Sequence, residues 1–145
     1  MARVLVFLIA VVAAASAQTT GTDCSNALSK AFSRIRVGNC NSKHIVDLKT
    51  SAMNPKCKNM EVYPGTYDAA ICDKILAAFF KCSGTSSGLL RQDGKFDTAV
   101  FNSQVLGGKC SANPKYQTAY IKCEADTMKN FNYIRLVACL QAAMK

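Results

Sequence analysis

The chain has 145 residues with eight cysteines, a single histidine and a formal net charge of +9. That length suits one domain with its own hydrophobic core. The basic excess favours anionic partners, and the lone histidine with no closely paired cysteines argues against a zinc site.

Residues 1–17 have the pattern of a secretory signal peptide. One positive charge, Arg3, precedes an apolar stretch from Val4 to Ala15, and small residues follow in the A-x-A form of a cleavage site. The apolar stretch is shorter than the roughly 20 residues of a membrane-spanning helix. We therefore expect a secreted, extracellular domain at residues 18–145, with 17 basic and 9 acidic side chains and a net charge of +8. We expect no transmembrane segment and no nucleic-acid partner.

All eight cysteines lie in the domain that remains after cleavage. In an oxidising compartment an even number of cysteines predicts four disulfides, and their spacing leaves all 105 pairings open. Paired cysteines cannot serve as nucleophiles, and we expect neither a metal nor a cofactor. The eight residues are Cys24, Cys40, Cys57, Cys72, Cys82, Cys110, Cys123 and Cys139.

The first two predicted helices occupy residues 23–38 and about 42–54. Asp23 is the expected N-cap of the first helix and Gly38 its expected end. Its apolar residues recur at helical spacing, which predicts one buried face. They are Cys24, Ala27, Leu28, Ala31, Phe32 and Ile35. The second helix is expected to turn Ile45, Leu48 and Ala52 inward and to end before Pro55, with a short helical turn near Cys57.

The most apolar predicted helix spans residues 66–84, from Thr66 as N-cap to Gly84 as terminator. Its apolar stripe predicts a central core helix. The stripe contains Ile71, Cys72, Ile75, Leu76, Phe79 and Phe80. Cys72 and Cys82 are ten residues apart, which places them about 80° apart around a helix and about 15 Å apart along it. We therefore expect them to bond to two different neighbours.

The polar segment 83–88 resembles a flexible linker. Beyond it we expect a helix near 97–106, a helix starting at Pro114 behind Asn113, and a last helix at 131–144 after a break near Asn130. The fold class predicted from these patterns is all-α: a compact secreted domain of about five to seven short helices cross-linked by four disulfides.

Basic residues concentrate at 30–58, where the local net charge is +6. Such a face on a rigid scaffold predicts an extracellular recognition protein, comparable to a signal, pheromone or toxin. It would bind a receptor, another partner protein or an anionic surface. The candidate partner-binding residues are Arg34, Arg36, Lys43, Lys49, Lys56 and Lys58.

An alternative hypothesis is an extracellular carrier of a small hydrophobic ligand or lipid. Aromatic and methionine side chains at helical spacing could line a cavity between helices, although such residues also make ordinary cores. The candidate ligand-binding residues are Phe79, Phe80, Tyr120, Met128, Tyr133 and Met144. Membrane action is a third alternative, because cationic amphipathic helices bind anionic bilayers.

Catalytic residues are not expected. His44 and Asp47 are three residues apart, so a helix would place them side by side. Such a pair could act as a general base and the carboxylate that orients it. No further nucleophile or metal-ligand pattern accompanies them, and the other carboxylates are scattered singly. We therefore expect a binding protein rather than an enzyme, and the oligomeric state stays open.

Overall fold

The computed structural model describes residues 21–145, so the predicted signal peptide at residues 1–17 lies outside the described part. Helices and turns make up these residues. They contain no β-strand, only one antiparallel bridge between Leu90 and Phe96. Together with four disulfides this confirms the all-α, cysteine-rich fold.

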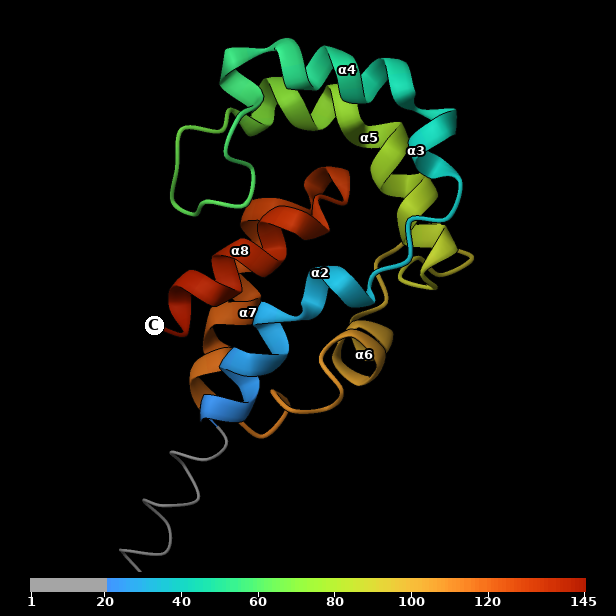
Figure 1. The fold of residues 1–145 in the computed structure, drawn as a ribbon. Helices are drawn as coiled ribbons and strands as arrows, with labels where there is room; N and C mark the ends of the chain where they lie inside the picture. The colour runs from blue at the N-terminus through green and yellow to red at the C-terminus, as the bar shows by residue number, and fades with distance from the viewer. Residues whose placement is uncertain (1–20) are drawn as a thin grey trace, which may run out of the picture.

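The described chain is helical at 21–29 and then forms a series of labelled elements. They are α2 (Ala31–Arg34), α3 (Cys40–Lys43), α4 (Ile45–Met53), η1 (Pro55–Cys57), α5 (Ala69–Ser86), α6 (Thr98–Val100), η2 (Phe101–Val105), α7 (Pro114–Thr127), η3 (Met128–Asn130) and α8 (Tyr133–Ala143). Figure 1 shows α4 lying along α5 at one end of the molecule, and α7, α8 and residues 21–29 gathered at the other.

The first predicted helix is broken in two, which raises the number of α-helices above the expected range. Lys30 has ψ 0° instead of the helical value of about −42°, and it separates residues 21–29 from α2. The predicted apolar face is buried except at Phe32, which is 37% exposed. Both expected ends are wrong: the helix includes residues before Asp23, and α2 ends at Arg34, well before Gly38.

The second predicted helix forms with a different inward face. Its end before Pro55 and the 3-10 turn at η1 are confirmed, but Ile45 and Ala52 are exposed and Ser51 is buried. Leu48 alone of the three expected residues packs against the core. Disulfides on both flanks of α4, Cys40–Cys82 and Cys57–Cys72, tie this segment to α5. These covalent ties, rather than the apolar pattern, set the face that α4 turns inward.

The central helix α5 is shifted two to three residues toward the C-terminus relative to the prediction. Its N-cap is Asp68, which accepts from the backbone N–H of Ile71, rather than Thr66. The helix continues through Gly84, whose missing Cβ would meet Leu90 Cγ at 3.0 Å. The prediction of a flexible linker at 83–88 is therefore wrong. Residues 83–86 belong to α5, and Gly84 is buried against Leu90.

The four disulfides each join different elements. They pair Cys24 with Cys110, Cys40 with Cys82, Cys57 with Cys72, and Cys123 with Cys139. The prediction that Cys72 and Cys82 bond to different neighbours is confirmed. Because Cys57 follows α4 and Cys40 precedes it, both bonds of α5 hold the α3–α4 segment.

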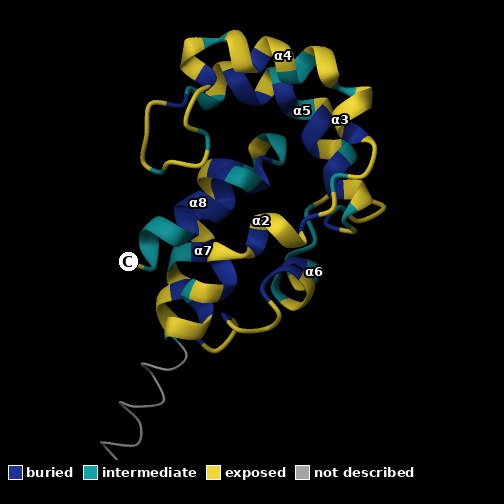
Figure 2. Ribbon diagram, in the orientation of Figure 1, coloured by how far each residue is buried: buried dark blue, intermediate teal, exposed yellow. Residues whose placement is uncertain are grey.

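The C-terminal half follows the sequence prediction closely. Asn113 caps α7 with Pro114 in its first turn, and the Asn113 side chain accepts from the N–H of Tyr116. The break before the last helix is confirmed: Phe131 has a left-handed φ of 59°, and α8 begins behind Asn132. Most of α8 is buried, which makes it the centre of the larger core cluster (Figure 2).

A buried polar network connects α5 to α8. The carboxylate of Asp73 accepts hydrogen bonds from Tyr67 Oη at 2.7 Å and from Asn132 Nδ2 at 2.6 Å. The guanidinium of Arg135 lies 5.0 Å from the Tyr63 ring centre and 4.9 Å from that of Tyr67. Burial and the Asp73 hydrogen bond raise the pKa of Tyr67 above its usual value. This network holds the 63–67 loop against α8. The sequence pattern did not predict it.

Candidate functional site

The structure leaves all six predicted basic side chains exposed and divides them between two parts of the molecule. Arg34 and Arg36 lie together, next to the C-terminal end of α5. The other four are lysines that follow the α3–α4–η1 segment: Lys43, Lys49, Lys56 and Lys58. Of these, Lys56 Nζ lies 3.5 Å from Asp68 Oδ2. The arginines therefore share one site, whereas the lysines surround α4.

The two arginines line a polar hollow of about 440 Å³. Its other walls come from the end of α5 and from η2. They are Ser86, Ser87, Gly88 and Gln104. None of these residues carries a negative charge, and the guanidinium, hydroxyl and amide groups are all hydrogen-bond donors.

The walls of this hollow are held in place by contacts between α5 and the 35–40 segment. Ser87 Oγ donates to the carbonyl of Arg36 at 2.7 Å. The Cys40–Cys82 disulfide joins α3 to α5 and leaves Cys40 Sγ 3.5 Å from Ser86 Oγ. Gly38 has a positive φ of 53°, which lets the chain turn sharply between Arg36 and α3.

Arg34 also lines a second, smaller hollow of about 140 Å³ on its other side. Asp23, Asn26, Ala27, Lys30 and Lys109 complete that hollow. The guanidinium donates from Nη1 to the carbonyl of Val105 at 2.9 Å, so it is fixed at the border of the two hollows. We refer to all the residues that line either hollow as the Arg34 surface.

The Arg34 surface carries four positive side chains and one negative one. The positive residues are Lys30, Arg34, Arg36 and Lys109, and Asp23 is partly neutralised by Lys109, whose Nζ lies 3.8 Å away. Two guanidiniums beside the Gln104 amide are suited to sulfate, phosphate or carboxylate groups, which arginine binds through two parallel hydrogen bonds. The Ser87 hydroxyl already donates to the Arg36 carbonyl and serves to hold the wall in place.

Sequence reasoning found only part of this surface. Lys109 and Gln104 lie far along the chain from Arg34, and no sequence signal links them. Ser86 and Ser87 fell in the segment wrongly predicted as a linker, so their position beside Arg36 was missed. The charge excess at 30–58 was the signal that located the arginines.

The predicted ligand-binding residues lie in or against the packed core. Phe79, Phe80, Tyr120 and Tyr133 are buried, and the ring centres of Phe80 and Tyr133 are 5.8 Å apart. Met128 and Met144 are partly buried against the same cluster. Burial raises the pKa of Tyr120 and of Tyr133. A hydrogen bond from Tyr120 to the Thr98 hydroxyl, and one from Tyr133 to the Ser83 hydroxyl, partly offset that rise.

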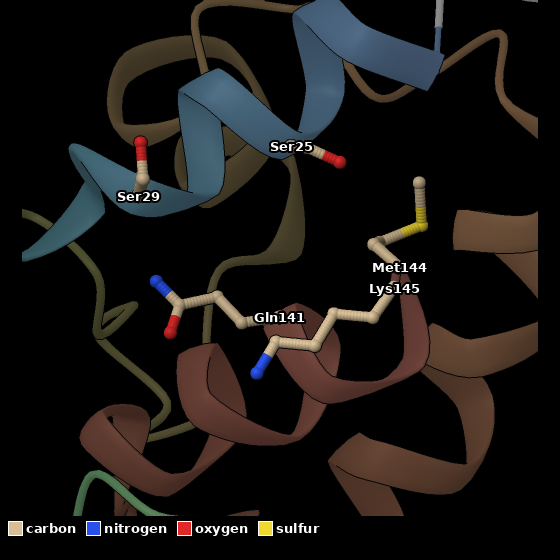
Figure 3. A pocket seen from close by; sticks show the side chains of 5 residues that line it. All are labelled: Ser25, Ser29, Gln141, Met144 and Lys145. Carbon is tan, nitrogen blue, oxygen red and sulfur yellow. The ribbon is translucent and has the colours of Figure 1, made fainter.

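Met144 lines a third hollow of about 400 Å³, at the C-terminal end of α8. Figure 3 shows its five residues: Ser25 and Ser29 lie on the helix at 21–29, and Gln141, Met144 and Lys145 lie opposite at the end of the chain, with the Ser29 hydroxyl pointing away from them. Gln141 Nε2 donates to the carbonyl of Leu28 at 3.0 Å and fixes α8 against residues 21–29. Of the six predicted ligand-binding residues, Met144 alone lines any of these three hollows.

The His44–Asp47 pair forms as the spacing predicted. His44 Nδ1 lies 3.4 Å from Asp47 Oδ2 on the outside of the α3–α4 segment. Within residues 21–145 no group of three His, Cys, Asp or Glu side chains is arranged to hold a metal ion. All eight cysteines are in disulfides, so no thiol is left to act as a nucleophile.

Comparison with known proteins finds no matching family model, no matching curated protein and no matching solved structure. Among the described helices, none is long and apolar enough to cross a membrane. Functional inference therefore depends on the chemistry of the residues themselves.

Proposed function

We propose that this chain is a secreted extracellular recognition protein that binds an anionic partner through the Arg34 surface. The position of the Arg34 guanidinium carries the proposal: it lines two hollows at once and is held there by Val105. A fixed guanidinium loses little conformational freedom when it binds an oxyanion, which favours specific binding over general attraction.

The disulfides and the predicted signal peptide support an extracellular compartment. Four disulfides are typical of proteins that fold in an oxidising environment. Anionic partners available there include sulfated glycans and acidic receptor surfaces. The lysines at 43–58 add to the positive potential and would increase the association rate, most strongly at low salt.

The test is binding to heparin, as a sulfated polysaccharide, over a range of salt concentrations. Arg36→Gln is the main variant, because the Arg36 side chain makes no hydrogen bond within residues 21–145. Lys122→Gln is the matched control: it removes the same charge from an exposed position on α7 that lines neither hollow. Arg36→Gln should elute at clearly lower salt than the wild type, and Lys122→Gln should elute close to it.

Equal shifts in the two variants would contradict the proposal, because net charge alone would then explain binding. Arg34→Gln should have the larger effect of the two arginine variants, since Arg34 lines both hollows. Its contact with Val105 also supports the fold, so its circular dichroism and thermal unfolding must be compared with the wild type before its binding is interpreted.

The carrier function is the second candidate, and the groove beside Met144 favours it. Its volume of about 400 Å³ is in the range of small-molecule sites. Native mass spectrometry of the protein from its own source, before and after solvent extraction, tests this function. A discrete bound small molecule that extraction removes would support the carrier, and the bare mass of the four-disulfide chain would count against it.

A further inference from the structure

Helix α4 exposes a cluster of aliphatic side chains to solvent. Val46 is 71% exposed, Met53 78% and Ile45 46%. At about 100° per residue these three positions and Lys49 fall within one arc of about 100° around the helix. We call Ile45, Val46, Lys49 and Met53 the α4 outer face. In Figure 2 most of α4 has the colour of exposed residues.

The fold does not need this face. The buried residue of α4 is Ser51, which is about 120–160° around the helix from the four residues of the outer face. The opposite side of α4 packs on α5, and the disulfides Cys40–Cys82 and Cys57–Cys72 hold both flanks of the segment there. Aliphatic side chains that cluster on an exposed face and do not pack in the core indicate an interaction surface.

The charges around the α4 outer face are almost all positive. Lys43 precedes the helix, Lys49 lies within the face and Lys58 follows it. Lys56 also follows the helix, but its Nζ lies 3.5 Å from Asp68 Oδ2. Asp47 is the one acidic residue between positions 40 and 58, and it lies on another side of the helix against His44. Lys49 therefore has aliphatic neighbours on its own face and no carboxylate among them.

We propose that the α4 outer face docks on an anionic lipid bilayer. Val46, Met53 and Ile45 would enter the headgroup boundary, while the lysine stems lie along them and the ammonium groups contact lipid phosphates. Docking requires no unfolding, because the face is already exposed on a helix that disulfides hold in place. This surface shares no residue with the Arg34 surface, none of whose lining residues lies on α4.

Three features favour a bilayer over a protein partner. The exposed side chains are aliphatic, whereas protein interfaces concentrate tyrosine, tryptophan and arginine, none of which occurs on this face. None of the three hollows described above is lined by a residue of α4. The cations are lysines, whose mobile ammonium groups suit disordered phosphates better than a fixed fork would.

The experiment is sedimentation of the mature, disulfide-bonded protein with phosphatidylcholine vesicles that contain or lack phosphatidylglycerol. The wild type should bind the anionic vesicles, and less so at high salt. The double variant V46S/M53S should bind them at least roughly tenfold more weakly, because two apolar side chains no longer enter the boundary. Ile121→Ser is the matched control: Ile121 is 73% exposed on α7, and its loss should leave binding unchanged.

Arg36→Gln separates this inference from the proposed function. It should weaken heparin binding and leave vesicle binding intact. If instead Arg36→Gln abolishes vesicle binding while V46S/M53S preserves it, the bilayer is merely one anionic partner of the Arg34 surface and the α4 inference is wrong. Absence of wild-type binding to anionic vesicles would also overturn it, as would a concentration-dependent dimer that V46S/M53S dissolves, since a second copy would then cover the face.

Discussion

Helices α4 and α8 are similar in length and both rich in aliphatic residues, yet the fold uses them in opposite ways. Seven of the eleven residues of α8 are buried, whereas α4 buries only Ser51 of its nine. Figure 2 shows this contrast, with α8 mostly dark and α4 mostly yellow. The aliphatic side chains of α8 therefore stabilise the protein, and those of α4 remain available to a partner.

The cause of the difference is the position of each helix in the fold. α8 packs on α7, is hydrogen-bonded to residue 28 through Gln141, and is connected to α5 through Asn132 and Asp73. α4 lies at the periphery, where its contacts are with α5 and with the short elements on either side of it. An apolar pattern shows that a residue can be buried, but burial requires a second surface to cover it.

The largest expected effect is on stability, from truncating one aliphatic side chain in each helix. Leu136→Ala on α8 removes a fully buried side chain and should lower the free energy of unfolding by about 3–5 kcal/mol. Val46→Ala on α4 should change it by no more than about 0.5 kcal/mol. Urea denaturation of the disulfide-bonded protein measures both, and comparable losses would mean that α4 is covered in solution.

Two disulfides that close loops of nearly equal length provide the next comparison. Cys123–Cys139 joins α7 to α8 across 16 residues, and Cys57–Cys72 joins η1 to α5 across 15. Loop-closure entropy predicts the same loss of about 3 kcal/mol when either pair is replaced by alanine. The local effects should differ: hydrogen exchange should accelerate in α4 only when Cys57–Cys72 is removed, because that bond holds the end of α4 on α5.

Either of two results would contradict this comparison. If the two losses differed by much more than 1 kcal/mol, packing of the sulfur atoms rather than chain entropy would dominate. If exchange in α4 stayed slow without Cys57–Cys72, the apolar contacts of Leu48 with the core would be sufficient to hold the helix, and the disulfides would not set its inward face.

The same contrast explains which parts of the fold the sequence could predict. The cap at Asn113, the break near Asn130 and the two separate partners of Cys72 and Cys82 depend on local geometry, and all three are confirmed. The inward face of α4 and the helical state of residues 83–86 depend on distant contacts with α5 and with Leu90, and both predictions were wrong.

The residues of the candidate site also fall into two groups: those that the local sequence indicated and those that only the folded chain brings to the site. The charge excess at 30–58 indicated Arg34 and Arg36, because net charge can be read directly from a sequence. Lys109 and Gln104 reach the same surface only through the folded chain, so no local pattern could have named them. The sequence likewise predicted a helix at about 42–54, but not that Ile45, Val46 and Met53 face solvent.

The smallest expected effects come from the N-caps of the two helices. Asn132 Oδ1 accepts from the N–H of Arg135, and Asn132 Nδ2 donates to buried Asp73, whereas the side chain of His44 makes no capping hydrogen bond to α4. Asn132→Ala should therefore cost about 2 kcal/mol, from the lost cap and a less satisfied carboxylate. His44→Ala should cost no more than about 0.5 kcal/mol, because His44 provides no cap and its 3.4 Å contact with Asp47 is partly exposed to solvent.

Asn132→Ser separates the two roles of Asn132. Serine keeps an oxygen that can cap α8 but has no amide to reach Asp73, so it should recover about 1 kcal/mol of the loss in Asn132→Ala. Thermal or urea unfolding of the three variants measures this directly. If serine were no better than alanine, the cap would contribute nothing, and the connection to Asp73 alone would hold the start of α8. The buried position of α8 would then depend on its polar link to α5 as well as on its aliphatic residues. The α4 segment, in contrast, is joined to α5 by disulfides.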